Sequence, residues 1–142
     1  TRFYKDQLWV DNSGYGELGY IDHHQFNPVI TLPGWTRGLC FKDHYAFVGI
    51  SRVIPEYQVY APGVHCDQSQ CGIVIIDMNT GEIVGSLLWP HGNQIFAVDW
   101  IDRNVTEGFP FELKKGQQYQ PDEQEKNFYY NFKLHKDESD GS

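Results

Sequence analysis

The chain has 142 residues, a formal net charge of −8 and a sequence pI near 5.0. Hydrophobic residues make up 40% and aromatic residues 15% of it, enough apolar material for one domain core, which excludes a globally disordered chain. An acidic surface repels phosphate backbones, so nucleic acid is not expected as a partner. No apolar run approaches the roughly 20 residues of a membrane helix. We therefore expect a soluble protein, cytoplasmic or secreted after processing, with the compartment left open.

Short runs rich in Val, Ile, Tyr, Phe and Trp follow one another along the first hundred or so residues. Each run is bounded by Gly, Pro, Asn or Asp, as is typical of β-strands separated by turns. No 3.6-residue periodicity is present before Asp102, so no helix is predicted. The predicted strands are Gln7–Val10, Leu18–Asp22, Pro28–Leu32, Gly38–Phe41, Ala46–Ile50, Gly72–Asp77, Ile83–Trp89 and Ile95–Trp100.

The strand pattern occurs twice. In both copies a strand ends at an Asp (Asp22, Asp77), and a second strand ends near a Pro and a Trp (Trp35, Trp89) before a third begins. Sheet units that repeat at about 40 residues indicate β-propeller blades. The predicted fold class is therefore all-β, with about two to three four-stranded antiparallel units of the propeller type.

The number of predicted blades is too small for a closed ring, because propellers typically have at least four. We therefore expect residues 1–113 to be a blade segment of a larger propeller. The missing blades would come from the same gene, from another protein chain or from a symmetry-related copy. Residues 114–142 are expected to be a polar tail, partly disordered or docked on a subunit, with an aromatic stretch at Asn127–Leu134.

Three motifs carry a resemblance: "LWVDNSGYGELGYID", "LPGWTRGLCFKDHYAFVGISR" and "CGIVIIDMNTGEIVG". Together they resemble the C-terminal half of a bacterial family of uncharacterised conserved hypothetical proteins, a domain of unknown function with a propeller-like fold. The resemblance spans Leu8 to Asp102 and implies no established reaction. Its relatives tend to have acidic residues where this chain has Asn93, Gln94 and Ala97. The resemblance therefore implies that any chemistry of those acids is lost here.

The entrance to the fourth predicted strand combines a bulky aromatic residue with a fixed charge. In a propeller this position faces the central channel, where the Arg37 guanidinium could bind a carboxylate or phosphate. Alternatively, Arg37 pairs with a carboxylate of the next blade and locks the ring. Arg52 lies at the same level, with Glu56 as a potential partner. The predicted ligand-binding residues are Trp35, Thr36, Arg37, Arg52 and His91.

The three cysteines do not make a closed disulfide framework. Cys40 is expected in the core, whereas Cys66 and Cys71 could pair in an oxidising compartment or stay as free thiols. A metal ion on His65, Cys66 and Cys71 is a further alternative, although their spacing matches no standard zinc module. No other cofactor is predicted. Asn104 begins a glycosylation sequon, which matters only in a eukaryotic secretory route.

These patterns favour a non-catalytic binding or assembly module that works within a larger protein or a multi-chain complex. Its expected partners are the protein chains or copies that complete the propeller. The alternative is a propeller enzyme, hydrolase-like or lactonase-like, with a polar or metal site in the central channel. No catalytic residue is identified in the sequence, so whether the protein is an enzyme stays open.

Overall fold

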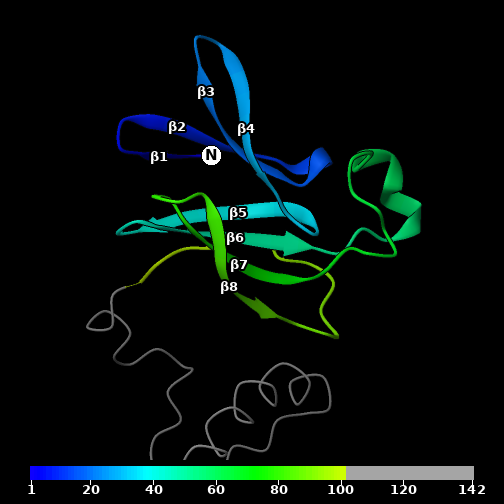
Figure 1. Cartoon of the computed structure of the whole chain (residues 1–142). Coiled ribbons are helices and arrows are strands. Elements are labelled where there is room, and N and C mark those ends of the chain that lie inside the picture. Colours follow the sequence, from blue (N-terminus) through cyan, green and yellow to red (C-terminus); the bar gives the residue numbers. More distant parts are fainter. Residues whose placement is uncertain (102–142) are drawn as a thin grey trace, which may run out of the picture. The chain divides into compact units, whose positions relative to one another are not determined.

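Short strands rich in β-branched and aromatic residues form two four-stranded antiparallel sheets in the computed structural model, which describes residues 1–101 (Figure 1). The first sheet contains β1 (Arg2–Tyr4), β2 (Gln7–Asn12), β3 (Glu17–Asp22) and β4 (Gln25–Thr31). The second contains β5 (Trp35–Lys42), β6 (Tyr45–Ser51), β7 (Gly72–Asp77) and β8 (Glu82–Leu88). Each sheet keeps its strands in chain order. The predicted all-β class with propeller-like blades is confirmed.

The structure differs from the predicted strands at several places, among them the start of β5, which lies at Trp35 and not at Gly38. β1 was not predicted, and two short 3-10 helices, η1 (Ser13–Tyr15) and η2 (Pro55–Tyr60), lie in connections that were expected to be irregular. The predicted strand at Ile95–Trp100 is wrong, because these residues have no strand neighbour within the described part of the chain. Instead of backbone-to-backbone strand pairing, the Ser51 hydroxyl forms hydrogen bonds with the Ile95 backbone. Ser51 Oγ accepts a hydrogen bond from the Ile95 N–H at 2.8 Å and donates one to the Ile95 carbonyl at 3.2 Å.

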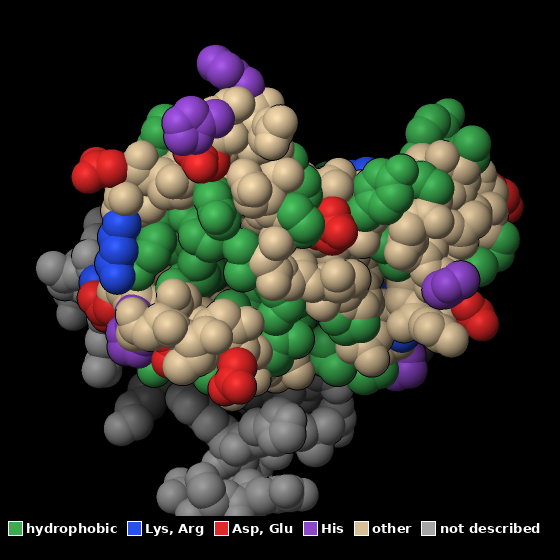
Figure 2. Space-filling view, turned by 45° about the horizontal axis from the view of Figure 1, so that its top comes forward, with side chains coloured by type: hydrophobic (Ala, Val, Ile, Leu, Met, Phe, Trp, Pro, Cys, Tyr) green, Lys and Arg blue, Asp and Glu red, His purple; other side chains and the backbone are tan. Residues whose placement is uncertain are grey.

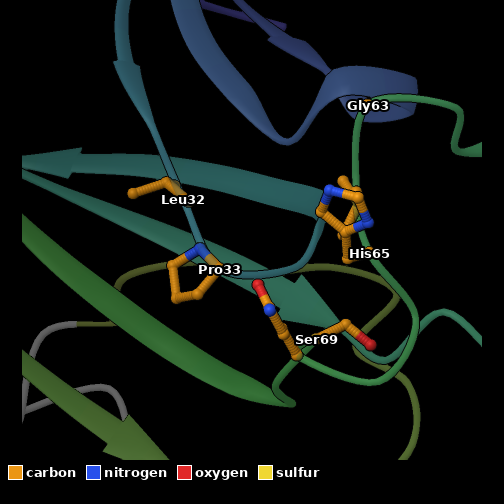
Figure 3. A pocket seen from close by; sticks show the side chains of 7 residues that line it. Leu32, Pro33, Gly63, His65 and Ser69 are labelled. Carbon is orange, nitrogen blue, oxygen red and sulfur yellow. The ribbon is translucent and has the colours of Figure 1, made fainter.

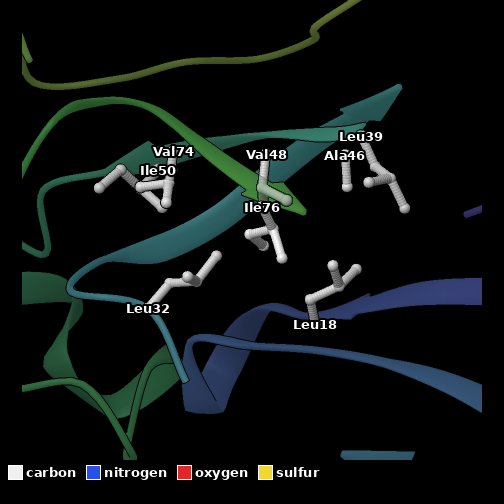
Figure 4. Close-up of a cluster of buried hydrophobic side chains, with 8 residues drawn as sticks. All are labelled: Leu18, Leu32, Leu39, Ala46, Val48, Ile50, Val74 and Ile76. Atoms are coloured by element: carbon white, nitrogen blue, oxygen red, sulfur yellow. The ribbon is translucent and has the colours of Figure 1, made fainter. Parts of the chain in front are cut away.

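The buried core lies between the two sheets (Figure 4). Leu18 of β3 is fully buried and faces alternate residues of β6 and β7, because those strands turn every second side chain towards the first sheet. Aromatic side chains close one side of this core, where Tyr4 stacks on Phe41 with ring centroids 4.6 Å apart. The cluster consists of Leu18, Leu32, Leu39, Ala46, Val48, Ile50, Val74 and Ile76.

The segment after β8 returns across the second sheet, on the face opposite the first sheet. Two glycines make room for it. A Cβ at Gly49 would lie 2.6 Å from the Ile95 side chain, and a Cβ at Gly38 would lie 2.6 Å from the Val98 nitrogen. Val98 is buried in this contact. Figure 1 shows this segment on the side of β5–β8 away from β1–β4. The segment therefore covers part of this outer face of the second sheet.

Replacing Gly38 by Ala tests this packing. Gly38 has φ +84, a left-handed conformation that costs a side chain about 1 to 2 kcal/mol, and its Cβ would also clash with residues 97 and 98. Gly81→Ala is the matched control, because Gly81 has φ +76 and open space around it. In urea denaturation of the full chain, we expect Gly38→Ala to lose about 2 kcal/mol more than Gly81→Ala. Equal losses would show that the segment does not pack there.

Candidate functional site

The longer connections gather at one end of the sheets, and the tight turns lie at the other. Backbone hydrogen bonds tie the longer connections together. The Leu32 N–H donates to Gly16, the Gly63 N–H to Gly14 and the Gln70 N–H to Pro33, over 2.7 to 2.9 Å. The residues at this end therefore belong to one cross-braced surface, which we call the loop end.

Arg37 and Trp35 lie together at the loop end of β5. The Arg37 guanidinium carbon sits over the Trp35 ring, 4.0 Å from its centroid, which is the geometry of a cation–π contact. The two side chains share a face because they are two positions apart on one strand. Among the described residues, Arg37 has no hydrogen bond and no ion pair. Its five N–H donors are available to an acceptor from outside residues 1–101.

Arg52 has a different role from Arg37. Its backbone N–H donates to the Asn93 carbonyl at 2.8 Å, and its Nη2 donates to the Pro90 carbonyl at 2.7 Å. No ion pair joins it to Glu56, which is exposed. Arg52 therefore holds the end of β6 to the connection that follows β8. His91, next to Pro90 in the chain, is exposed at the loop end.

Thr36 points into the fold. Its side chain is fully buried, and its register partner Ile50 belongs to the core between the sheets. The Thr36 carbonyl accepts a hydrogen bond from Ser13 Oγ at 2.7 Å, whereas Thr36 Oγ1 is buried with no hydrogen-bond partner. Of the five residues predicted to bind a ligand, the structure thus brings Trp35 and Arg37 into contact and turns Thr36 towards the core.

A small hollow of about 150 Å³ lies at the loop end between the two sheets' connections (Figure 3). The Ser69 hydroxyl has a structural role, because it accepts a hydrogen bond from the Val53 N–H and donates one to the Cys66 carbonyl. The polar groups left to face an occupant belong to His65 and Gln68. The lining residues are Leu32, Pro33, Gly63, Val64, His65, Gln68 and Ser69. Sequence reasoning singled out His65 but not this hollow, whose walls come from two distant loops.

All three cysteines are free thiols in the structure. Burial raises the pKa of the Cys40 thiol, with the Asp99 carboxylate adding to the effect, and burial also raises the pKa of Cys71 against the opposing charge of Arg52. Raised pKa values keep these thiols protonated and poorly nucleophilic at neutral pH. The Cys66–Cys71 disulfide stays a prediction for oxidising conditions.

No group of three or more His, Cys, Asp or Glu side chains comes close enough to hold a metal ion within residues 1–101. The predicted metal ligands His65, Cys66 and Cys71 are therefore not gathered into a site. Cys66 packs against the small apolar cluster of Val53, Ala61 and Val64. The sequon at Asn104 and the tail of residues 114–142 lie outside the described residues, as does the predicted boundary after residue 113.

Asp11 is a partly buried acid that was not among the predicted site residues. Its Oδ1 is buried with no hydrogen-bond partner, and β2 places it on the same face as Trp9, towards the second sheet. Burial raises the pKa of Asp11 from 3.8 to about 6, although nearby positive charge, including that of Arg2, acts in the opposite direction. The alternation Trp9-Val10-Asp11 was the available signal, because it puts the acid on the apolar face.

A family model matches residues 1–107, and its description is "Domain of unknown function (DUF4915)". The chain belongs to this family. The match confirms the predicted membership of an uncharacterised family, whereas the bacterial source, the family's propeller-like fold and the assignment to its C-terminal half stay predictions. In the same comparisons, no curated protein and no solved structure matches the chain. Within residues 1–101, the chain contains no helix of the length and apolar character that crossing a bilayer demands.

The Asp11 carboxyl makes the stability of the folded chain depend on pH. Its pKa is higher in the folded chain, so the stability it contributes in acid is lost as the pH rises from about 4 through about 6. Asp11→Asn removes the buried charge. Near pH 8 we expect the free energy of unfolding of this variant to exceed that of the wild type by about 2 to 3 kcal/mol. Near pH 4 we expect the two values to be about equal.

Urea denaturation at the two pH values measures this difference, with the exposed Asp6→Asn as the control. Asp6 has φ +61, a conformation that Asn also tolerates, so the control should not change the pH dependence. An Asp11→Asn variant with the same pH profile as the wild type would show that Asp11 is ionised at no cost in the folded chain.

Proposed function

We propose that this DUF4915 chain is a non-catalytic β-propeller segment that assembles with further β-sheet blades, in a larger protein or a multi-chain complex. The observation that carries the proposal is the open apolar face of the first sheet. A sheet that has one face on the core commonly keeps polar side chains on the other face. Here apolar side chains stand on both faces.

One apolar row crosses all four strands of the first sheet on the face away from the second sheet. Strand register places Phe3 opposite Leu8, Leu8 opposite Ile21, and Ile21 opposite Phe26. Phe26 lies close over Gly19, where a Cβ would meet its ring at 2.6 Å. Phe3 is 75% exposed. A contiguous apolar face of this kind is typical of a surface that another element covers.

The second sheet also presents apolar side chains on its outer face. Ile73 and Ile75 of β7 point there, and Leu87 lies beside Ile73 in register. The returning segment covers part of this face with Ile95 and Val98 but leaves Phe96 75% exposed. Figure 2, turned so that the top of Figure 1 comes forward, shows hydrophobic side chains gathered on the side of the first sheet.

The packing of one sheet on the other indicates what the outer faces would accept. The first sheet covers one face of the second through Leu18, Trp9 and Tyr4. On the opposite face of the second sheet, Ile95 and Val98 lie against Gly49, and this is where the proposal puts the next blade. A further sheet that packs in the same manner on each outer face continues the arrangement around a ring.

The buried thiols give the hydrolase-like alternative no nucleophile of low pKa. Cys40 and Cys71 have raised pKa values, and amide or methyl groups occupy positions 93, 94 and 97. Within residues 1–101, no specific arrangement favours the hydrolase-like alternative over assembly.

Charge placed on the open faces should disrupt assembly. We expect the native particle that contains the chain to exceed 16.5 kDa, and we expect Phe3→Glu or Phe96→Glu to weaken its association at least about tenfold. A buried glutamate on an interface loses its hydration without gaining a partner, which is the physical reason for the loss. Native mass spectrometry and sedimentation velocity on the full chain measure the association.

Val59→Glu is the matched control. Val59 lies on η2, is 75% exposed like Phe3 and Phe96, and its replacement changes the charge by the same amount. It should leave the particle intact. A stable 142-residue monomer as the native form, or equal effects of all three variants, would contradict the proposal.

A further inference from the structure

The Arg37 side chain is held in a fixed place without an acceptor for its donors. It is partly buried, its guanidinium carbon lies 4.0 Å from the Trp35 ring centroid, and it makes no hydrogen bond within residues 1–101. The chain carries 19 acidic side chains against 11 basic ones, so an arginine with no carboxylate partner is unexpected on charge balance alone. A partly desolvated guanidinium normally gains its stability from a carboxylate or carbonyl oxygen.

The backbone around Arg37 is fixed as well. The register between β5 and β6 shifts between Thr36 and Leu39, and Gly38 adopts φ +84 within that bulge. The returning segment packs directly on Gly38, so it fixes the bulge from outside. A β-bulge re-aims the side chains next to it. Arg37 is thus positioned before any ligand arrives, which lowers the entropy cost of binding.

Arg52 shows what a structural arginine looks like in the same protein. Its Nη2 donates to the Pro90 carbonyl, and it ties two connections together. Arg37 makes no such tie. The loop end therefore has two arginines with different roles. Arg52 is hydrogen-bonded to the fold, whereas the N–H donors of Arg37 have no acceptor within residues 1–101.

We infer that Arg37, on its Trp35 platform, binds a carboxylate through paired N–H donors. A carboxylate matches the planar fork of a guanidinium, whereas a phosphate would bring up to two negative charges to a chain of net charge −8 with a single unspent guanidinium at this place. The carboxylate belongs either to a small-molecule ligand or to an acidic side chain of a docked sheet. The second source rests on the proposed assembly, and the first does not.

The test uses the full chain with ¹⁵N-labelled arginine, titrated with sodium acetate against sodium chloride at matched ionic strength. A small-molecule source predicts a saturable shift of the Arg37 Nε–Hε NMR signal, with the exposed Arg2 signal unaffected. Arg37→Lys should weaken acetate binding about tenfold, because an ammonium cannot form the paired contact. Arg2→Lys is the matched control and should leave the binding unchanged.

A docked acidic side chain predicts another result. In the native particle, the Arg37 Nε–Hε proton would then be protected from solvent exchange and silent to acetate, and Arg37→Gln would weaken association about tenfold. The inference is overturned if Arg37 responds to acetate no more than Arg2 and Arg37→Gln leaves the particle unchanged. A monomeric native chain would contradict the proposed assembly alone, because the acetate titration would still decide the role of Arg37.

Discussion

Burial of Leu18 and its neighbours between the two sheets is the contact on which the rest of the structure depends. Neither sheet has a helix to cover it within residues 1–101, so each sheet needs the other to exclude water from its apolar face. Loss of a buried leucine of this kind typically costs about 2 to 5 kcal/mol. The shared core also brings corresponding ends of the two sheets together, because Leu32 belongs to it while its backbone N–H donates to Gly16, between β2 and β3. This alignment brings the longer connections together at the loop end.

The strands could be predicted from the sequence where the signal is local. Gly72–Asp77 was predicted with its observed bounds, because an apolar run there is followed by a turn with Gly81 at positive φ. β1 was missed because its three residues are followed by Lys5 and Asp6, which reach φ +47 and +61 without a glycine or an asparagine. Residues 95–100 have strand composition, but a strand exists only where a neighbour supplies the other half of the ladder. Composition alone cannot report that neighbour.

Contacts in the candidate site could be predicted only where the residues lie close together in the sequence. The contact of Trp35 with Arg37 follows from their spacing on β5, although the predicted strand began only at Gly38. The bond from Arg52 to Pro90 spans 38 residues and needs the fold to bring the two together. Asp11 combines both cases. Its place on the apolar face could be predicted from its spacing from Trp9 in the sequence. Its raised pKa depends on burial, which needs the folded structure.

The two repeats differ most in the connection between their middle strands, and this difference bears on where function can reside. In the first repeat that connection is the short η1 turn, whereas in the second it runs from Arg52 to Cys71 and contains η2. The longer connection leaves the strand register of its own sheet intact, since Gly72 still pairs with Ile50. It provides His65 and Gln68 of the hollow, and it exposes Val59 and Tyr60 to solvent. Sequence can change in such a loop without cost to the core, which the sheets already complete. The features that distinguish this chain from a plain pair of blades therefore lie on the second blade, at the loop end where β5 also presents Arg37.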